Sequence, residues 1–393
     1  MTTIRSAVCV RCPPRWLMLR IETDDGEVGW GEAIGDLHQE VEQALNAIGE
    51  RVEGSPIHDI TNLIQIQRKN RFWRDGPVLE TALSALEMAL WDLKGKLLGA
   101  PVHDLLGGRV RERVRVYRNL WGRSPEEFAD SAKEAISNSM TAVKVSPAGP
   151  TPDVISRVQL DEMEAVVSAV RDAVGPAVDL AIDLHGRLTP AASRRAIHAL
   201  SKYDPFFIEE PCLPDGSASH LADLRALRTA QPVAIATGER LRSAHAFAEH
   251  LLPSPVVDII QPDVSMVGGI RASVEIGAMA SAAQVAMAPH CPYGPVQFAA
   301  SMQVAATSPA HLIQEFQSLG GAGSGGGAPG GGQNWAFELL SQPFSIEMGH
   351  VEISSRPGLG IEVLEERIDE HMDMWNPHPP TVWNHPDGSH AEW

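Results

Sequence analysis

The stretch Val178-Asp179-Leu180-Ala181-Ile182-Asp183 is a short apolar run that ends in a carboxylate. The same pattern, an apolar run that ends in a carboxylate, recurs in Phe206-Phe207-Ile208-Glu209-Glu210-Pro211. The interval between Asp183 and Glu209 accommodates one strand, one helix and their connections, which is the repeating unit of a parallel sheet. Working outward in both directions, we predict eight such strands, at Val114–Arg118, Ala142–Ser146, Val178–Asp183, Phe206–Glu210, Val233–Glu239, Val257–Asp263, Val285–His290 and Leu312–Glu315.

Helical stretches fall between these eight runs. Ser124-Pro125-Glu126-Glu127 has the capping residue and the proline that open a helix, and Gly175-Pro176 is typical of a helix end. Eight strands with helical crossovers predict an α/β fold, a parallel barrel of the TIM type. A doubly wound open sheet is the structural alternative, but no G-x-G-x-x-G follows the first strand, which disfavours a dinucleotide-binding sheet.

The chain before Val114 follows a different pattern. Two strand-like runs surround Asp24-Asp25-Gly26, which predicts a hairpin, and leucines at positions 83, 86, 90, 93 and 97 form one apolar helical stripe. We therefore predict an α+β domain over residues 1–113, a barrel over residues 114–345 and a C-terminal segment over residues 346–393. Within the barrel region, the glycine-rich tract 320–332 cannot form a core, and we expect it to be mobile.

Composition and charge limit the classes of function. The 393 residues include 32 Lys and Arg against 50 Asp and Glu, a formal net charge of −18, which disfavours binding to nucleic acid or to an anionic membrane. No apolar run reaches the ~20 residues of a membrane span, and the first residues lack the apolar stretch of a signal peptide. Because four cysteines are too few for a disulfide scaffold, we expect a cytoplasmic protein with reduced thiols.

Three acids, Asp183, Glu209 and Glu239, stand at the ends of consecutive predicted strands. In a parallel barrel these ends meet around one mouth, where three converging carboxylates would be costly without a cation. Hard oxygen ligands suit Mg²⁺ better than zinc. Because side chains alternate along a strand, only one of Glu209 and Glu210 should point inward. We predict that Glu209 is the ligand and that Glu210 supports it from behind or forms an ion pair.

Two histidines are expected beside that metal. His185 follows Asp183 by two residues, and His290 ends the seventh predicted strand. Two histidines facing a three-carboxylate metal site form an arrangement for general acid and general base catalysis. Asp263, one strand before His290, can accept the second ring N–H and so fix the tautomer and basicity.

Two further residues complete the predicted set. Glu315, at the end of the eighth strand, could donate a hydrogen bond to a substrate carboxylate if it is protonated. Lys144, in the second strand, could neutralise a substrate carboxylate, or act as a second base if its pKa is depressed. The alternatives are a rim salt bridge for Glu315 and a solvated side chain for Lys144.

These residues resemble the enolase superfamily, in its mandelate racemase and muconate lactonizing enzyme-like branch. The three acids alone would indicate only the superfamily, whereas Asp183-x-His185 with the late Pro-His-Cys-Pro is more specific and resembles its acid-sugar dehydratases. The resemblance runs nearly end to end, through Gly29-Trp30-Gly31-Glu32, Asp183-Leu184-His185-Gly186-Arg187, Gly238-Glu239-Arg240, Gln261-Pro262-Asp263, Pro289-His290-Cys291-Pro292 and Ala391-Glu392-Trp393.

The resemblance implies a modified (β/α)₇β barrel with an α+β cap, formed by the N-terminal segment and the C-terminal tail. It implies one Mg²⁺ per subunit, a small sugar-acid substrate and an assembly larger than a monomer. D-Galactonate or a related aldonate would lose water through an enediolate to give a 2-keto-3-deoxy acid. Carried onto this chain, His290 with Asp263 would take the proton next to the carboxylate, His185 would protonate the departing hydroxyl, and Glu315 and Lys144 would help to hold the intermediate.

Two other functions remain open from the sequence. A racemase or epimerase of a 2-hydroxy acid would use the same metal, with Lys144 as one base. A catalytically idle sugar-acid-binding protein would keep the metal site without turnover, although the presence of both histidines argues against it. The family pattern has Asn where this chain has Ser146, and the loop Ile34–Gln39 also departs from it. These departures leave the particular sugar acid open.

Overall fold

The N-terminal part of the chain forms an antiparallel sheet packed against helices, here called the cap (β1–β3 and α1–α4). The computed structural model describes residues 2–213, 218–316, 339–377, 382–385 and 387–392. Gly26 adopts a φ of 86° in the predicted turn, and the runs on either side of it pair as a hairpin. The elements of the cap are β1 (Ile4–Cys12), β2 (Trp16–Thr23), β3 (Val28–Ala33), α1 (His38–Val52), α2 (Ile60–Lys69), α3 (Pro77–Leu98) and α4 (Val102–Leu105).

The predicted leucine stripe lies on α3, the longest helix of the cap. Its first four leucines are buried, and the helix ends at Gly99, whose φ of 63° is the left-handed conformation common at helix ends. Gly31 lets β3 approach α3 closely, because a Cβ atom there would overlap the carbonyl oxygen of Ala85. The hairpin and the helix share one core, while Met18, Trp30 and Met88 of the same elements belong to the core of the barrel.

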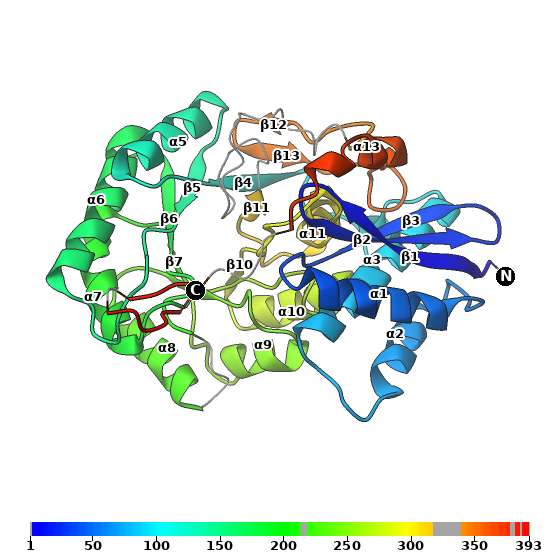
Figure 1. Cartoon of the computed structure of the whole chain (residues 1–393), viewed down its shortest axis with the longest axis horizontal. Helices are drawn as coiled ribbons and strands as arrows, with labels where there is room; N and C mark the ends of the chain where they lie inside the picture. The colour runs from blue at the N-terminus through cyan, green and yellow to red at the C-terminus, as the bar shows by residue number, and fades with distance from the viewer. Residues whose placement is uncertain (1, 214–217, 317–338, 378–381, 386, 393) are drawn as a thin grey trace.

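Within the described residues, eight parallel strands form a closed barrel with seven crossover helices outside it, which confirms the predicted (β/α)₇β fold (Figure 1). β4 to β10 pair in chain order, β11 returns to β4, and a bridge between Met287 and His311 closes the ring. The strands are β4 (Arg113–Asn119), β5 (Ala142–Val145), β6 (Asp179–Asp183), β7 (Ile208–Glu209), β8 (Ile235–Thr237), β9 (Ile259–Ile260), β10 (Ala286–Met287) and β11 (Gln314–Phe316). The helices are α5 (Pro125–Ser137), α6 (Arg157–Val174), α7 (Pro190–Leu200), α8 (Ala218–Ala230), α9 (Ala244–Leu251), α10 (Ile270–Ala282) and α11 (Pro295–Thr307), with a 3₁₀ turn, η1 (Ser201–Tyr203), after α7.

β8, β9 and β10 end earlier than predicted. Gly238 adopts a φ of 137°, which takes the chain out of the strand, and Pro262 and Pro289 have no N–H to donate to a neighbouring strand. The predicted strands were therefore too long at their C-terminal ends. This correction moves Glu239, Asp263 and His290 from strand ends to the loops that follow at the barrel mouth.

The C-terminal segment crosses from the barrel to the cap and back. β13 pairs antiparallel with the start of β4, Glu365 of α13 forms an ion pair with Arg20 of β2 at 2.9 Å, and the Trp383 ring lies 4.3 Å from the guanidinium of Arg187 at the mouth. The glycine tract 320–332 and Trp393 fall outside the described residues. The described elements of this segment are β12 (Ile346–Glu347), β13 (His350–Glu352), α13 (Glu365–Glu370) and the 3₁₀ turn η2 (Met372–Met374).

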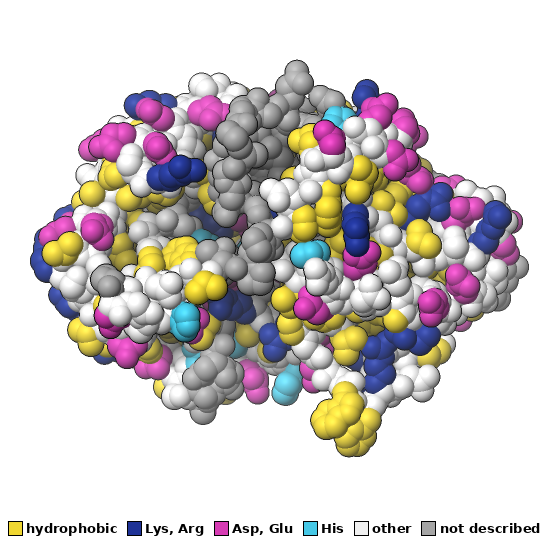
Figure 2. All heavy atoms as spheres, viewed as in Figure 1, with side chains coloured by type: hydrophobic (Ala, Val, Ile, Leu, Met, Phe, Trp, Pro, Cys, Tyr) yellow, Lys and Arg dark blue, Asp and Glu magenta, His cyan; other side chains and the backbone are white. Residues whose placement is uncertain are grey.

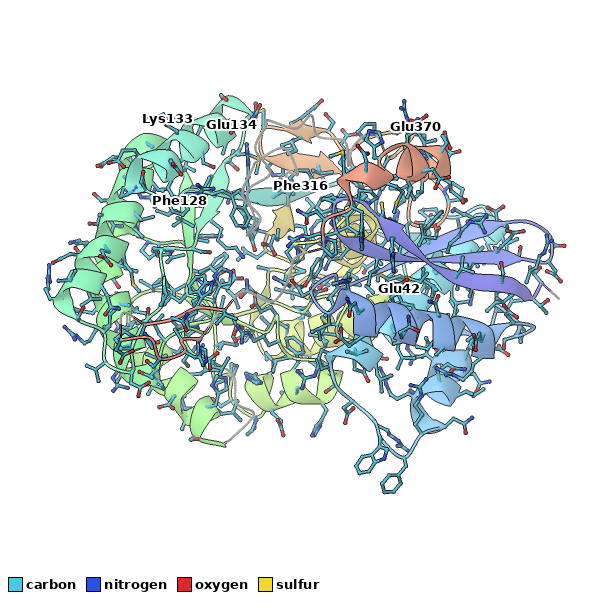
Figure 3. The ribbon with its side chains drawn as sticks, in the orientation of Figure 1. Glu42, Phe128, Lys133, Glu134, Phe316 and Glu370 are labelled. Atoms are coloured by element: carbon cyan, nitrogen blue, oxygen red, sulfur yellow. The ribbon has the colours of Figure 1, made fainter. Side chains whose placement is uncertain are left out.

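The exterior mixes charges of both signs (Figure 2). On α5, Lys133 and Glu134 lie on the outside of the barrel, whereas Phe316 of β11 is buried against Phe298 of α11 (Figure 3). Phe72 and Trp73, in the loop between α2 and α3, are 88% and 82% exposed and project from the cap. Among the described residues, no helix is both long and apolar enough to cross a membrane.

Candidate active site

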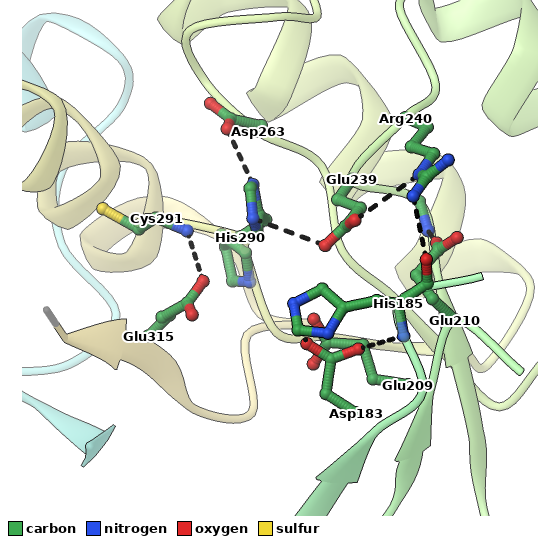
Figure 4. A network of polar contacts seen from close by, with 12 residues as sticks. Asp183, His185, Glu209, Glu210, Glu239, Arg240, Asp263, His290, Cys291 and Glu315 are labelled. Atoms are coloured by element: carbon green, nitrogen blue, oxygen red, sulfur yellow. Dashed lines mark hydrogen bonds and ion pairs between the residues drawn. The ribbon is translucent and has the colours of Figure 1, made fainter. Parts of the chain in front are cut away.

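The predicted site residues lie together at the mouth of the barrel (Figure 4). Asp183 and Glu209 are the last residues of β6 and β7 and pair with each other in the parallel register. The loops after β8, β9 and β10 bring three further residues to the same place. Lys144 of β5 and Glu315 of β11 complete the cluster from within their strands. The contacts described below join the eight predicted residues in two groups, which are Lys144, Asp183, His185, Glu209 and Glu315, and Glu239, Asp263 and His290.

Lys144 is buried among carboxylates rather than solvated. Its Nζ lies 2.8 Å from Glu209 Oε1, 3.1 Å from Glu315 Oε1 and 3.7 Å from Asp183 Oδ2. Burial alone would lower the pKa of Lys144, but Glu209 and Glu315 raise it well above its usual value. In this arrangement the side chain is a fixed positive charge, which is not the neutral amine that a base requires.

His185 is held against Asp183 by two contacts. Its Nε2 lies 3.1 Å from Asp183 Oδ2, and its backbone N–H donates to Asp183 Oδ1 at 2.8 Å. The residue has a φ of 52°, so the chain turns sharply at this point. Burial lowers the pKa of His185, although Asp183 acts in the opposite direction. Burial alone would raise the pKa of Asp183, but the charges of His185 and Lys144 bring it below its usual value.

His290 lies between two carboxylates. Its Nδ1 is 2.8 Å from Asp263 Oδ2, and its Nε2 is 3.4 Å from Glu239 Oε2 (Figure 4). Burial alone would lower the pKa of this histidine, but Glu239 and Asp263 raise it to about 10. The contact with Asp263 assigns the proton on Nδ1 and leaves Nε2 facing the cluster, as predicted for a histidine oriented by a carboxylate.

The cluster carries an excess of negative charge. Burial raises the pKa of Glu209 well above its usual value, Lys144 lowers it, and Asp183 adds to the rise. Glu209 Oε2 is buried and has no hydrogen-bond partner among the described residues. Such an oxygen, in an oxygen-only donor set with Asp183 and Glu239, fits a hard divalent cation such as Mg²⁺.

The carboxylates are not yet arranged around a single point. Within the described parts of the chain, no three His, Cys, Asp or Glu side chains converge closely enough to hold an ion as they stand. Lys144, His185 and His290 lie 2.8, 3.1 and 3.4 Å from Glu209, Asp183 and Glu239, the three predicted ligands.

Glu210 and Glu315 are both held by backbone N–H groups. Glu210 Oε1 accepts from Thr237 Oγ1 at 2.5 Å and from the Gly238 N–H at 2.8 Å, so its carboxylate supports the turn that presents Glu239. Glu315 accepts from the Cys291 N–H at 2.6 Å and from Lys144. Burial alone would raise the pKa of Glu315, but Lys144 and His290 lower it to about 2. Glu315 is thus an acceptor here, and not the protonated donor considered from the sequence.

The cap closes one side of the site. A cavity of about 240 Å³ lies between Ile34 and Pro77 of the cap and His290 of the barrel, and Arg240 and Arg242 also line it. Sequence reasoning did not identify these cap residues, because the contact joins segments that lie far apart along the chain. Arg240 was quoted only as part of a motif, yet it donates to the His185 carbonyl at 2.8 Å.

Two further residues were missed. Asn119 Nδ2 donates to Glu315 Oε1 at 2.7 Å, and Gln297 Nε2 donates to Asp263 Oδ1 at 2.8 Å. Neither amide shows a spacing or motif that would have separated it from an ordinary core or helix residue. Asn119 ends β4, so its place at a strand end was the one available signal.

Solved structures and curated proteins similar to this chain agree on its family. The D-galactonate dehydratases of Variovorax paradoxus and Pectobacterium atrosepticum are 37% and 36% identical over 388 residues, 98% of each chain. The crystal structure of a mandelate racemase/muconate lactonizing enzyme from Sulfitobacter sp. has a TM-score of 0.84 and 30% identity, covering 94% of this chain and 96% of that one. An enolase from Agrobacterium radiobacter, solved with Na and L-malate bound, has a TM-score of 0.86 and 28% identity, covering 99% and 98%.

Both parts of the chain match domain families. Residues 3–107 match the N-terminal domain of mandelate racemase and muconate lactonizing enzyme, and residues 127–367 match the enolase C-terminal domain-like family. With these matches, the barrel and the cap above it, the chain belongs to the enolase superfamily, in its mandelate racemase and muconate lactonizing enzyme-like branch.

Proposed function

We propose that the protein is a Mg²⁺-dependent dehydratase of a sugar acid, with D-galactonate as the first substrate to try. The observation that carries the proposal is the pair of histidines, each in contact with one of the carboxylates of the predicted metal set. The names of the curated relatives support a dehydratase of this kind. Asp183, Glu209 and Glu239 would hold the ion, which would supply positive charge where negative charge builds up on the substrate carboxylate.

The first half of the reaction is removal of the proton next to the carboxylate. His290 is the proposed base, because Asp263 holds its Nδ1–H and leaves Nε2 to accept a proton. A base has to be neutral, so the pKa of about 10 describes a site in which the charge of Glu239 is not yet neutralised. Glu239 is the largest of the influences that raise this pKa, and a cation on Glu239 would remove it.

The second half is departure of the neighbouring hydroxyl. His185 is the proposed acid that protonates it, because it lies beside Asp183 at the same mouth. Loss of the proton from one carbon and of the hydroxyl from the next leaves an enol, which becomes a 2-keto-3-deoxy acid. Lys144 would hold the negatively charged enediolate, and Glu315 would keep Lys144 in place through their contact at 3.1 Å.

Lys144 does not favour the racemase alternative. That reaction needs a base on the other face of the substrate, and Lys144 is surrounded by three carboxylates that keep it charged. A reaction that returns a proton to the same carbon would therefore lack one of its two bases.

A screen of acid sugars tests the proposal. The purified protein with Mg²⁺ is incubated with D-galactonate and a panel of other aldonates, and 2-keto acid formation is measured. We expect one aldonate to be converted, EDTA to stop the reaction and added Mg²⁺ to restore it. If no acid sugar is converted while one of them still raises the melting temperature, the protein is a binding protein and the proposal is wrong. Undiminished turnover in EDTA would exclude the metal.

A further inference from the structure

Asp263 holds His290 with one oxygen, and its other oxygen is itself held. Oδ2 lies 2.8 Å from the His290 Nδ1, while Oδ1 accepts from the Ser265 N–H at 2.7 Å and from Gln297 Nε2 at 2.8 Å. A carboxylate with partners on both oxygens cannot rotate about its Cβ–Cγ bond without breaking a hydrogen bond. The ring direction of His290 therefore depends on what fixes Gln297.

Both polar atoms of the Gln297 side-chain amide form hydrogen bonds. Gln297 is the third residue of α11 and is fully buried. Its Oε1 accepts from the Tyr293 N–H at 2.9 Å, and its Nε2 donates to Asp263. These two hydrogen bonds fix the orientation of the amide. If the amide were flipped, its NH₂ group would face the Tyr293 N–H and its oxygen would face the Asp263 carboxylate, and neither pair could form a hydrogen bond.

The cap holds the helix turn that carries Gln297. Glu32, a buried residue of β3, accepts from the Gly294 N–H and, at 2.9 Å, from the Gln297 N–H. A carboxylate at this place satisfies N–H groups that have no partner within the helix and complements the helix dipole. Gly294 permits the approach, because a Cβ atom there would lie 2.6 Å from Glu32 Oε1.

We propose that Gln297, fixed by Glu32 of the cap, is a positioning residue that sets the orientation of Asp263 and, through it, of the His290 ring. The inference rests on the proposed function, in which His290 is the base. It goes further by making the orientation of the base depend on docking of the cap against α11. A hydrogen-bonded path then runs from β3 through Gln297 and Asp263 to His290.

The same helix offers a matched control. Gln303 is also a buried glutamine of α11, and its amide binds the His103 N–H at 3.0 Å and the Leu359 carbonyl at 3.0 Å. It links α11 to α4 of the cap and to the C-terminal segment without contacting Asp263. Replacing either glutamine by methionine keeps length and helix propensity while removing the hydrogen bonds.

The test compares Gln297→Met with Gln303→Met by steady-state kinetics on the substrate found in the screen. We expect Gln297→Met to lower kcat by about 10–100-fold, the usual effect of removing a residue that orients a catalytic group, with KM nearly unchanged. Gln303→Met should leave kcat within about twofold of wild type at a similar loss of melting temperature. Equal kcat values for the two variants would overturn the proposal.

Glu32 is tested by a double-mutant cycle. If Glu32 acts through Gln297, the loss of kcat in Glu32→Gln/Gln297→Met should be clearly smaller than the product of the two single losses. Losses that multiply would show that Glu32 acts independently and would remove it from the path.

A crystal structure of Gln297→Met separates this inference from the proposed function. We expect the Asp263 carboxylate to turn and its contact with the His290 Nδ1 to lengthen or become disordered. An unchanged contact would overturn the positioning role even if the wild type converts a sugar acid. Absence of turnover in the wild type would instead count against the proposed function alone.

Discussion

At the scale of single residues, the two histidines of the mouth differ because their neighbours differ. His290 has a carboxylate on each ring nitrogen, and its pKa is raised to about 10. His185 has one carboxylate but also lies near Arg187 and Lys144, and burial lowers its pKa. The same side chain thus meets two opposite environments beside one cluster of acids. Taken alone, a raised pKa suits an acid and a lowered pKa suits a base, which is the reverse of the proposed roles. The proposed cation on Glu239 would remove the charge that contributes most to raising the pKa of His290.

His290→Asn tests the base. The amide is unable to accept the proton, so both dehydration and exchange of the substrate's α-proton with D₂O should fall by at least ~10²-fold, the lower end of what general base catalysis contributes. Product formation and deuterium incorporation are measured on the same samples, and the melting temperature checks folding. Exchange at the wild-type rate would exclude His290 as the base.

His185→Asn tests the acid. Without a proton for the departing hydroxyl, dehydration should fall by ~10²-fold or more, while α-proton exchange continues because His290 is intact. The variant is followed by NMR of the substrate in D₂O alongside a keto-acid assay. Full dehydration activity in this variant would reject the acid role, and loss of exchange as well would indicate a shared function of the two histidines.

The residues at the mouth were predictable to different degrees. Asp183 and Glu209 end apolar runs at barrel-unit spacing, and the ends of parallel strands must meet, so their proximity follows from the sequence. Gln297 lies more than one strand–helix unit after Asp263, on the first turn of a helix. The hydrogen bond between Gln297 and Asp263 depends on how that turn packs against a loop and a cap strand. Packing of this kind produces no periodic pattern in the sequence.

At the scale of elements, an apolar pattern in the sequence predicts which residues are buried better than it predicts which residues pair in the sheet. All eight predicted strand regions contain a strand, but Val257 and Ala288 are fully buried outside β9 and β10. Ala288, which precedes Pro289, still donates to the Ile260 carbonyl at 2.9 Å, but Pro289 has no N–H with which to continue the ladder. The sequence therefore predicts where each strand crosses the core and overestimates how far its ladder extends.

The close approach of β3 to α3 is testable by Gly31→Ala. The added methyl group would overlap the Ala85 carbonyl, so strand and helix must separate, and we expect a destabilisation of about 1–3 kcal/mol. Urea denaturation measures it. Gly149→Ala is the control, because no atom lies within 4 Å of its Cβ position, and it should stay within about 0.5 kcal/mol of wild type. Equal stability of both variants would contradict the close packing.

At the scale of the whole molecule, buried acids of the cap fasten it to the barrel at helix N-termini. Glu32 binds the start of α11, as described above. Glu87 of α3 accepts from the Ile270 N–H at 2.7 Å and from the Arg271 N–H at 3.0 Å at the start of α10. The two helices follow β9 and β10, whose loops carry Asp263 and His290. The cap is therefore docked onto the part of the barrel that carries the proposed base.

This docking predicts how stability depends on pH. Burial raises the pKa of Glu32 to about 8 and that of Glu87 to about 7, although backbone N–H groups oppose the rise. Between the usual value of 4.5 and these raised values, the folded state binds more protons than the unfolded state. The free energy of unfolding should therefore fall as pH rises through this window, by at most about 1.4 kcal/mol per pH unit for each group, and level off above it.

Glu87→Gln isolates one of these two contributions, because the amide does not titrate. Unfolding is measured by urea denaturation from about pH 5 to about pH 9 in wild type and variant, and the difference between the two curves is taken. Other buried acids, such as Glu210, titrate in both proteins and cancel in that difference. The wild type should lose stability relative to the variant as pH rises from about 4.5 towards 7, with no further change above. Parallel curves would mean that Glu87 keeps its ordinary pKa, and that the N–H groups of α10 compensate fully for its burial.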